Sequence, residues 1–164
     1  MESVARFLQT KANSCPPDSR DFDLFGRSSF NRYYYAVYLE VRTILGDLNV
    51  TWLTAQHASI PMLLTGQVLD AINHQRKRAT KVGDNEAVQI CLRGAAAARE
   101  LAALMKDAYA VRVTADYHPD IPVKPSDRGR FQLNLMPVTT AHDWAPRARL
   151  LAPTIKRAWS LAHV

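Results

Sequence analysis

Apolar residues recur at intervals of three and four along most of this chain, the spacing that places side chains on one face of a helix. The pattern predicts helices over about residues 2–12, 29–46, 54–79, 85–117 and 140–162. The stripe of the second helix is formed by Phe30, Tyr34, Val37, Val41 and Ile44. On the first helix the predicted buried side carries Val4, Phe7 and Leu8. Small residues on the stripe of the fourth helix should let a neighbouring helix approach closely.

Polar and helix-breaking residues mark where several of these helices start and stop. Ser28 or Ser29 fits the start of the second helix and Asp84 the start of the fourth, because such side chains accept hydrogen bonds from first-turn amides. Gly83 and Pro119 end the third and fourth helices. The last helix should contain Pro146 in its first turn and a kink at Pro153.

The long irregular segment is residues 118–139, where alternating Phe131, Leu133 and Leu135 indicate one short extended piece. Long helices joined by short connections favour an all-α, antiparallel bundle. We therefore expect about five helices, the last one kinked, in a single domain over residues 1–164.

Composition narrows the class of protein. The 164 residues are 48% hydrophobic and 22% charged, with a net charge of +6, which suits a folded domain with acidic partners such as nucleic acid. Many domains are mildly basic without such a partner. The sequence contains no signal peptide, no membrane-spanning run and no disulfide pattern around Cys15 and Cys91. A cytoplasmic protein without membrane association is expected.

Several catalytic signatures are missing from the sequence. It has no glycine-rich phosphate loop, no Gly-x-Ser-x-Gly elbow and no His-Glu-x-x-His pair, and its histidines lack metal-ligand spacing. We therefore expect neither a metal nor a cofactor.

One candidate constellation remains, between Arg112 and His118. Arg112 and Asp116 can pair one helical turn apart, and Tyr117 and His118 follow at the helix end. An imidazole can exchange protons with a 2′-hydroxyl or a leaving oxygen while a guanidinium holds the phosphate, which is enough to cleave RNA without a metal. The same residues also fit an ordinary helix end, with a local ion pair, a packed tyrosine and a loop histidine.

A basic run lies near the end of the third predicted helix, at Arg76, Lys77, Arg78 and Lys81. These side chains are candidate contacts for RNA phosphates. Such a run is also typical of a solvated helix end that the helix dipole favours.

The second helix carries a cluster of tyrosines. Tyr34 falls on the apolar stripe and should be core, whereas Tyr35 and Tyr38 should be freer to stack on bases. We assign Arg32 and Tyr35 to RNA contacts.

Three motifs occur in the order found in one branch of the HEPN domains. The run from Asn31 to Ala36 resembles the Ser-Arg-x-Tyr-Tyr-Ala of that branch's second helix, and His57 resembles the histidine that starts its next helix. The end of the 85–117 helix is similar to its Arg-x-x-Ala-Asp-Tyr signature, at Arg112, Ala115, Asp116 and Tyr117. The order and spacing agree with that branch across about residues 26–162.

This resemblance implies a helical bundle that dimerises. Many HEPN proteins are metal-independent ribonucleases of toxin–antitoxin, CRISPR and phage-defence systems, with an arginine, a short spacer and a histidine in a cleft built by both subunits. Arg112 and His118, with five residues between them, satisfy that motif. In the branch that ends in Ala-Asp-Tyr the histidine is often lost, and members without it bind nucleotides, RNA or a partner protein.

The leading hypothesis is a homodimeric HEPN-type endoribonuclease with a toxin or defence role. His118 is its acid and base, Arg112 clamps the phosphate, Asp116 orients Arg112 and Tyr117 shapes the cleft. The alternative is a non-catalytic binding module that pairs with a nucleotidyltransferase-type antitoxin or another defence partner. A third possibility is a helical adaptor that dimerises through the small residues of the fourth helix.

Overall fold

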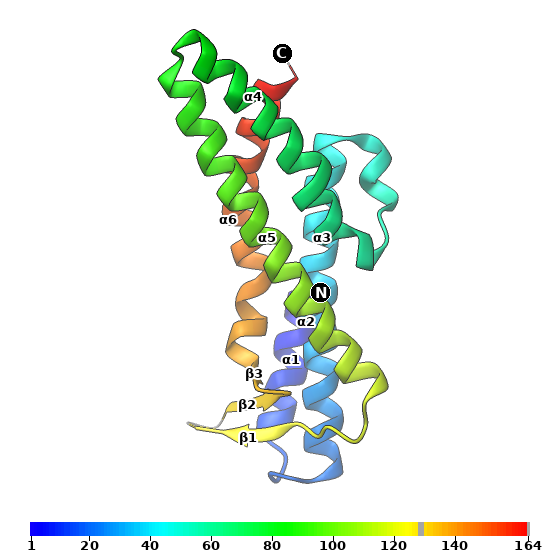
Figure 1. The fold of residues 1–164 in the computed structure, drawn as a ribbon. Helices are drawn as coiled ribbons and strands as arrows, with labels where there is room; N and C mark the ends of the chain where they lie inside the picture. Colours follow the sequence, from blue (N-terminus) through cyan, green and yellow to red (C-terminus); the bar gives the residue numbers. More distant parts are fainter. Residues whose placement is uncertain (128–129, 164) are drawn as a thin grey trace. The chain divides into compact units, whose positions relative to one another are not determined.

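Most of the chain is helical in the computed structural model, which describes residues 1–127 and 130–163 (Figure 1). Its α-helices are α1 (Glu2–Asn13), α2 (Arg20–Leu48), α3 (Ile60–Leu63), α4 (Leu69–Val82), α5 (Asn85–Tyr117) and α6 (Val138–Ala162). Shorter turns are η1 (Val50–Thr54), η2 (His57–Ser59) and the π-helical η3 (Leu64–Val68). The antiparallel strands β1 (Lys124–Ser126), β2 (Arg130–Leu133) and β3 (Met136–Pro137) form a sheet in that order. The expectation of a mainly helical fold is confirmed, with a small sheet added.

The start of α2 differs from the prediction. Ser19 caps the helix, since its Oγ accepts a 3.1 Å hydrogen bond from the backbone N–H of Phe22. Ser28 and Ser29 therefore lie inside the helix, and the Ser29 hydroxyl donates to the Gly26 carbonyl. A capping serine earlier in the chain extends α2 toward the N-terminus.

Two further helix ends are confirmed, and two proline positions differ from the prediction. The Asp84 carboxylate accepts a 3.0 Å hydrogen bond from the Ala87 N–H at the start of α5. Gly83 ends α4 in the left-handed region, at φ +74°.

In contrast, the segment predicted as one helix over residues 54–79 begins with short turns, and α3 starts only at Ile60. Pro61 therefore occupies the first turn of α3 rather than a helix interior. Because α6 begins at Val138, Pro146 also lies in the helix interior and not in its first turn.

Burial agrees with the second-helix stripe, whose five apolar residues are all buried. The prediction for α1 was wrong, because Ala5 and Ala12 are buried while Val4 and Phe7 are exposed. Helix α1 therefore buries its small alanine side and leaves larger side chains at the surface. Tyr38 was expected to be free but is buried as well.

The chain divides into two compact units. The first comprises residues 1–39 and 107–145. In it the Phe131 ring of β2 packs edge-on against Phe22 and Phe30 of α2, at centroid distances of 5.7 and 5.9 Å. The predicted alternation ends at Leu133, because Leu135 has a positive φ of 64° and an exposed side chain in the turn before β3.

The second unit comprises residues 40–106 and 146–164, of which Val164 is outside the described residues. Trp159 of α6 packs against Trp52, and its Nε1 donates to the Leu48 carbonyl at 3.0 Å. Gly94 of α5 faces Ala158 so closely that an added Cβ would lie 2.2 Å from the Ala158 Cβ. The predicted close approach to the small-residue stripe of this helix is thereby confirmed.

Among the described residues, no helix combines the length and apolarity that a bilayer crossing needs.

Candidate functional site

The predicted pair of Arg112 and Asp116 is present in the last turns of α5. The Arg112 Nε lies 2.8 Å from the Asp116 Oδ2, and the Asp116 Oδ1 accepts a 2.7 Å hydrogen bond from the Asn31 amide. The Arg112 Nε is buried and makes no aligned hydrogen bond within the described residues, so the short contact is an ion pair rather than a directed hydrogen bond. Asp116 is therefore held between a guanidinium and an amide from α2.

Two tyrosines complete the surroundings of Arg112. The guanidinium carbon lies 5.3 Å from the centre of the Tyr117 ring. Burial acts to lower the pKa of Arg112, but Asp116 and the hydroxyls of Tyr117 and Tyr35 together raise that pKa above its ordinary value. The side chain is 19% exposed, so Arg112 is a permanent and largely covered cation.

His118 follows the end of α5 and has a different environment. Its side chain is 50% exposed, and its Nδ1 lies 4.0 Å from the Asp120 carboxylate. Its backbone N–H donates to the Thr114 carbonyl at 3.2 Å. No hydrogen bond or ion pair joins His118 to Arg112 in residues 1–127 and 130–163. The two predicted catalytic side chains are thus not linked to each other by a polar interaction among the described residues.

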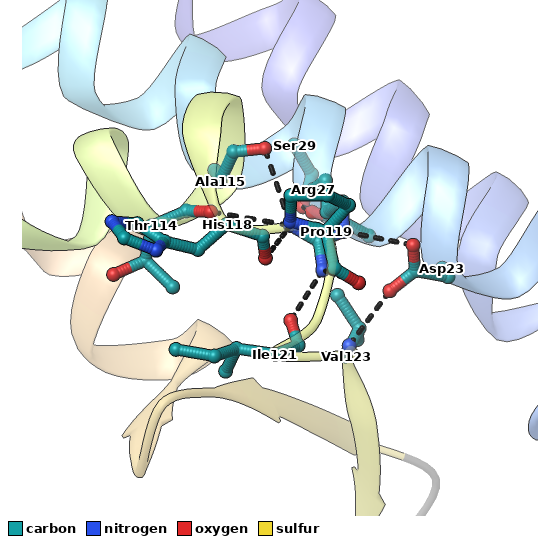
Figure 2. Close-up of polar contacts among 10 residues, drawn as sticks. Asp23, Arg27, Ser29, Thr114, Ala115, His118, Pro119, Ile121 and Val123 are labelled. Atoms are coloured by element: carbon teal, nitrogen blue, oxygen red, sulfur yellow. Dashed lines mark hydrogen bonds and ion pairs between the residues drawn. The ribbon is translucent and has the colours of Figure 1, made fainter.

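Arg27 of α2, which the sequence analysis missed, fastens the segment that carries His118 (Figure 2). Its Nη1 donates to the carbonyls of Thr114, Ala115 and His118 at 3.2, 3.3 and 3.1 Å. Its Nη2 donates to the carbonyls of Pro119 and Ile121. The last carbonyls of a helix lack intrahelical partners, so Arg27 acts as a cap for α5 from outside the helix.

Asp23 and Gly26 also hold the segment after α5 against α2. The Asp23 Oδ2 pairs with the Arg27 Nε at 2.7 Å, while its Oδ1 accepts a 2.8 Å hydrogen bond from the Val123 N–H (Figure 2). A Cβ on Gly26 would lie 2.9 Å from the Val123 Cγ1, so only glycine allows this approach without a shift. The backbone of His118 is consequently fixed while its imidazole faces solvent.

A cavity of about 340 Å³ opens on this part of the first unit. Ser28, Asn31, Arg32 and Asp116 are among the residues that line it. Arg32 is exposed and has no carboxylate partner within the described residues. The predicted RNA contact Arg32 therefore lies beside the Asp116 network, where it can receive an anionic group.

Tyr35 has a more restricted position than predicted for a base-stacking residue. It is half-buried, and its ring packs edge-on against Tyr34 at 5.7 Å and against Tyr38 at 6.4 Å. Because its hydroxyl also acts on the pKa of Arg112, Tyr35 belongs to the surroundings of that guanidinium.

The predicted basic run falls in the second unit, whereas Arg112 and His118 belong to the first. Arg76, Lys77 and Lys81 of α4 line a cavity of about 480 Å³. Arg78 is not among its lining residues, and its Nε donates to the Gln75 side chain at 2.9 Å.

Within the described residues, no group of three or more histidines, cysteines and carboxylates is placed to hold a metal ion. Cys15 and Cys91 are free thiols.

Comparison with protein-family models, with curated proteins and with solved structures yields no match to this chain. The resemblance to HEPN domains therefore stays a prediction that depends on the quoted motifs.

Proposed function

We propose that this chain is a HEPN-type, metal-independent endoribonuclease with its catalytic groups where α5 ends. One observation carries the proposal: Arg27 fixes the backbone of His118 while leaving its imidazole half exposed, on the segment where Asp116 holds Arg112. Such an arrangement supplies a proton-transfer group on a fixed backbone and a cation of fixed charge.

The chemistry follows from the groups available. The His118 imidazole removes the proton from a ribose 2′-hydroxyl, and the 2′-oxygen attacks the adjacent phosphorus. The bond from phosphorus to the 5′-oxygen breaks, and that oxygen receives the proton that His118 took up, which returns the imidazole to its neutral form. The products are a 2′,3′-cyclic phosphate and a 5′-hydroxyl. Arg112 stabilises the charge on the phosphoryl oxygens, and Arg32 binds a flanking phosphate at the cavity.

The proposed active unit is a homodimer. In the HEPN proteins that the motifs resemble, both subunits contribute to one cleft, and the same is proposed here for Arg112 and His118 of two copies. Tyr117, whose side chain is 64% exposed beside Arg112, lies where a second copy or an RNA strand would meet the site.

The test is cleavage of single-stranded RNA by the purified protein in EDTA. We expect cyclic phosphate ends, no cleavage of the matching DNA, and a loss of about 100-fold or more in rate for His118→Ala and for Arg112→Ala. His74→Ala, which removes an exposed histidine of α4, is the matched control and should keep the wild-type rate. Because the His118 ring is half exposed, His118→Ala should unfold within about 0.5 kcal/mol of wild type. Wild-type cleavage by both active-site variants would refute the proposal.

A second function has one observation in its favour. The Arg112 guanidinium is largely covered by Asp116 and Tyr117, which suits a site that binds without cleaving. In this alternative the chain is a HEPN-type binding module for RNA or for a nucleotidyltransferase-type antitoxin or defence partner. RNA binding that weakens with Arg32→Ala, without any cleavage product, would establish the binding module in place of the nuclease.

A further inference from the structure

A groove in the second unit is formed by α4 and the first part of α5. We call it the α4–α5 groove, and its lining residues are Arg76, Lys77, Thr80, Lys81, Val88 and Leu92. Its volume is about 480 Å³. None of these residues belongs to the proposed catalytic groups, so the proposed nuclease activity assigns no role to the groove.

The lining residues are spaced for helix packing. Lys77 and Lys81 on α4, like Val88 and Leu92 on α5, lie four residues apart, and such positions form neighbouring points of one ridge. Helices α4 and α5 are joined at Gly83 and Asp84 and run in opposite directions from there (Figure 1). Residues of both helices line the groove. A ridge of a third helix fits a groove of this kind.

The charge of the groove is uncompensated. Cations on α6 of the same unit are paired with carboxylates, in Arg147–Glu100, Arg149–Glu40, Lys156–Asp47 and Arg157–Glu86. By contrast, Arg76, Lys77 and Lys81 have no carboxylate partner within the described residues. Three adjacent cations without counter-charges favour an acidic occupant.

The apolar side of the groove distinguishes between acidic occupants. Val88 is half-buried and the Leu92 side chain is 39% exposed, so burying them would stabilise a complex. Sites for single-stranded RNA combine cations with aromatic rings on which bases stack, and the groove has no aromatic residue among those that line it. A helix with leucines one turn apart and glutamates beside them satisfies both the aliphatic and the cationic residues.

We propose that the α4–α5 groove is the docking site for an acidic amphipathic helix of a partner protein. The cations predicted from sequence to contact RNA thus serve a protein partner. The groove recognises leucine side chains through Val88 and Leu92, and flanking carboxylates through Lys77 and Lys81. Exposed ion pairs contribute little individually, so the aliphatic contacts carry much of the affinity and the lysines set the orientation.

The probe is a synthetic helical peptide with two leucines one turn apart and glutamates flanking them. Its control has the same composition and net charge, but its leucines and glutamates do not share a face. Calorimetric titration of the 164-residue protein should show saturable binding of the first peptide at one site. The control peptide should bind at least about tenfold more weakly.

Variants of the groove test each contact. Leu92→Ser and the double substitution Lys77→Glu with Lys81→Glu should each weaken peptide binding about tenfold or more. A peptide with lysines in place of glutamates should bind the double variant better than wild type. Arg99→Glu, at an exposed position of α5 outside the groove, is the matched control and should bind like wild type. Circular dichroism confirms that each variant is folded.

Equal binding of the two peptides, or unchanged binding by the groove variants, would overturn the proposal. So would RNA binding that is lost in the double variant but insensitive to Leu92→Ser, because it would assign the groove to phosphates. The peptide titration does not depend on RNA cleavage, so its outcome is separate from that of the nuclease assay.

Discussion

Two arginines act on the end of α5 in different ways. Arg27 spreads its guanidinium over the backbone carbonyls from Thr114 onward, whereas Arg112 directs its charge to the side chain of Asp116. The fork of a guanidinium suits several acceptors at once, and the negative end of a helix favours a cation there. The Arg27 region therefore positions the backbone, whereas the Arg112 region positions a charge.

The aspartates that pair with these two arginines differ in the same way. Asp23 pairs with Arg27 and also accepts a hydrogen bond from the Val123 N–H, so it fastens a second part of the backbone. Asp116 pairs with Arg112 and accepts from the Asn31 side chain, so it completes a side-chain network beside the cavity. Stability should therefore depend more on the first region and the proposed activity more on the second.

The largest effect should come from Arg27→Ala. Loss of this side chain, which is 12% exposed, leaves carbonyls and the Asp23 carboxylate without their donor and should cost about 3 kcal/mol of unfolding free energy. Arg27→Lys should recover less than half of that loss, because an ammonium cannot spread over the same acceptors. Urea unfolding measures both variants, with Arg99→Ala as an exposed control. A change below about 0.5 kcal/mol for Arg27→Ala would contradict the comparison.

We expect Asp116→Ala to lose less unfolding free energy than Arg27→Ala. It removes a local ion pair and the acceptor of Asn31, which should cost about 1–2 kcal/mol because both partners keep some contact with water. Asp116→Asn retains an acceptor for Asn31 and should fall between this variant and wild type. The same urea assay compares them with Arg27→Ala. If Asp116→Ala proved the more costly of the two, the assignment of stability to the Arg27 region would be wrong.

Gly26→Ala should have the smallest effect of the three. The new methyl group must displace Val123 by a few tenths of an ångström, and the expected cost is about 1 kcal/mol. Gly66→Ala provides the control, since no atom lies within 4 Å of a Cβ at that position, and it should be neutral or stabilising. Equal thermal stabilities for both variants would show that the approach of Val123 to α2 is not close in solution.

The sequence predicted features that depend on near neighbours. The stripe of α2, the Asp84 cap, the Gly83 stop and the pair of Arg112 with Asp116 all involve residues within a few helical turns. The buried side of α1 was not predictable in this way. Which side of a short helix is buried depends on its neighbours, and there the small side of Ala5 was preferred to the larger Phe7.

The local pattern of the chain was enough to predict most of the helical segments and the pair of Arg112 with Asp116, because helical periodicity and capping act over three or four residues. Only the tertiary structure decided that Arg27 holds the segment of His118, since their hydrogen-bonded atoms belong to residues 91 positions apart. It also decided that Arg32 lies beside Asp116 and that the α4 cations line a groove with Leu92. Contacts of this kind depend on how distant helices pack, and no local spacing in the chain encodes that packing.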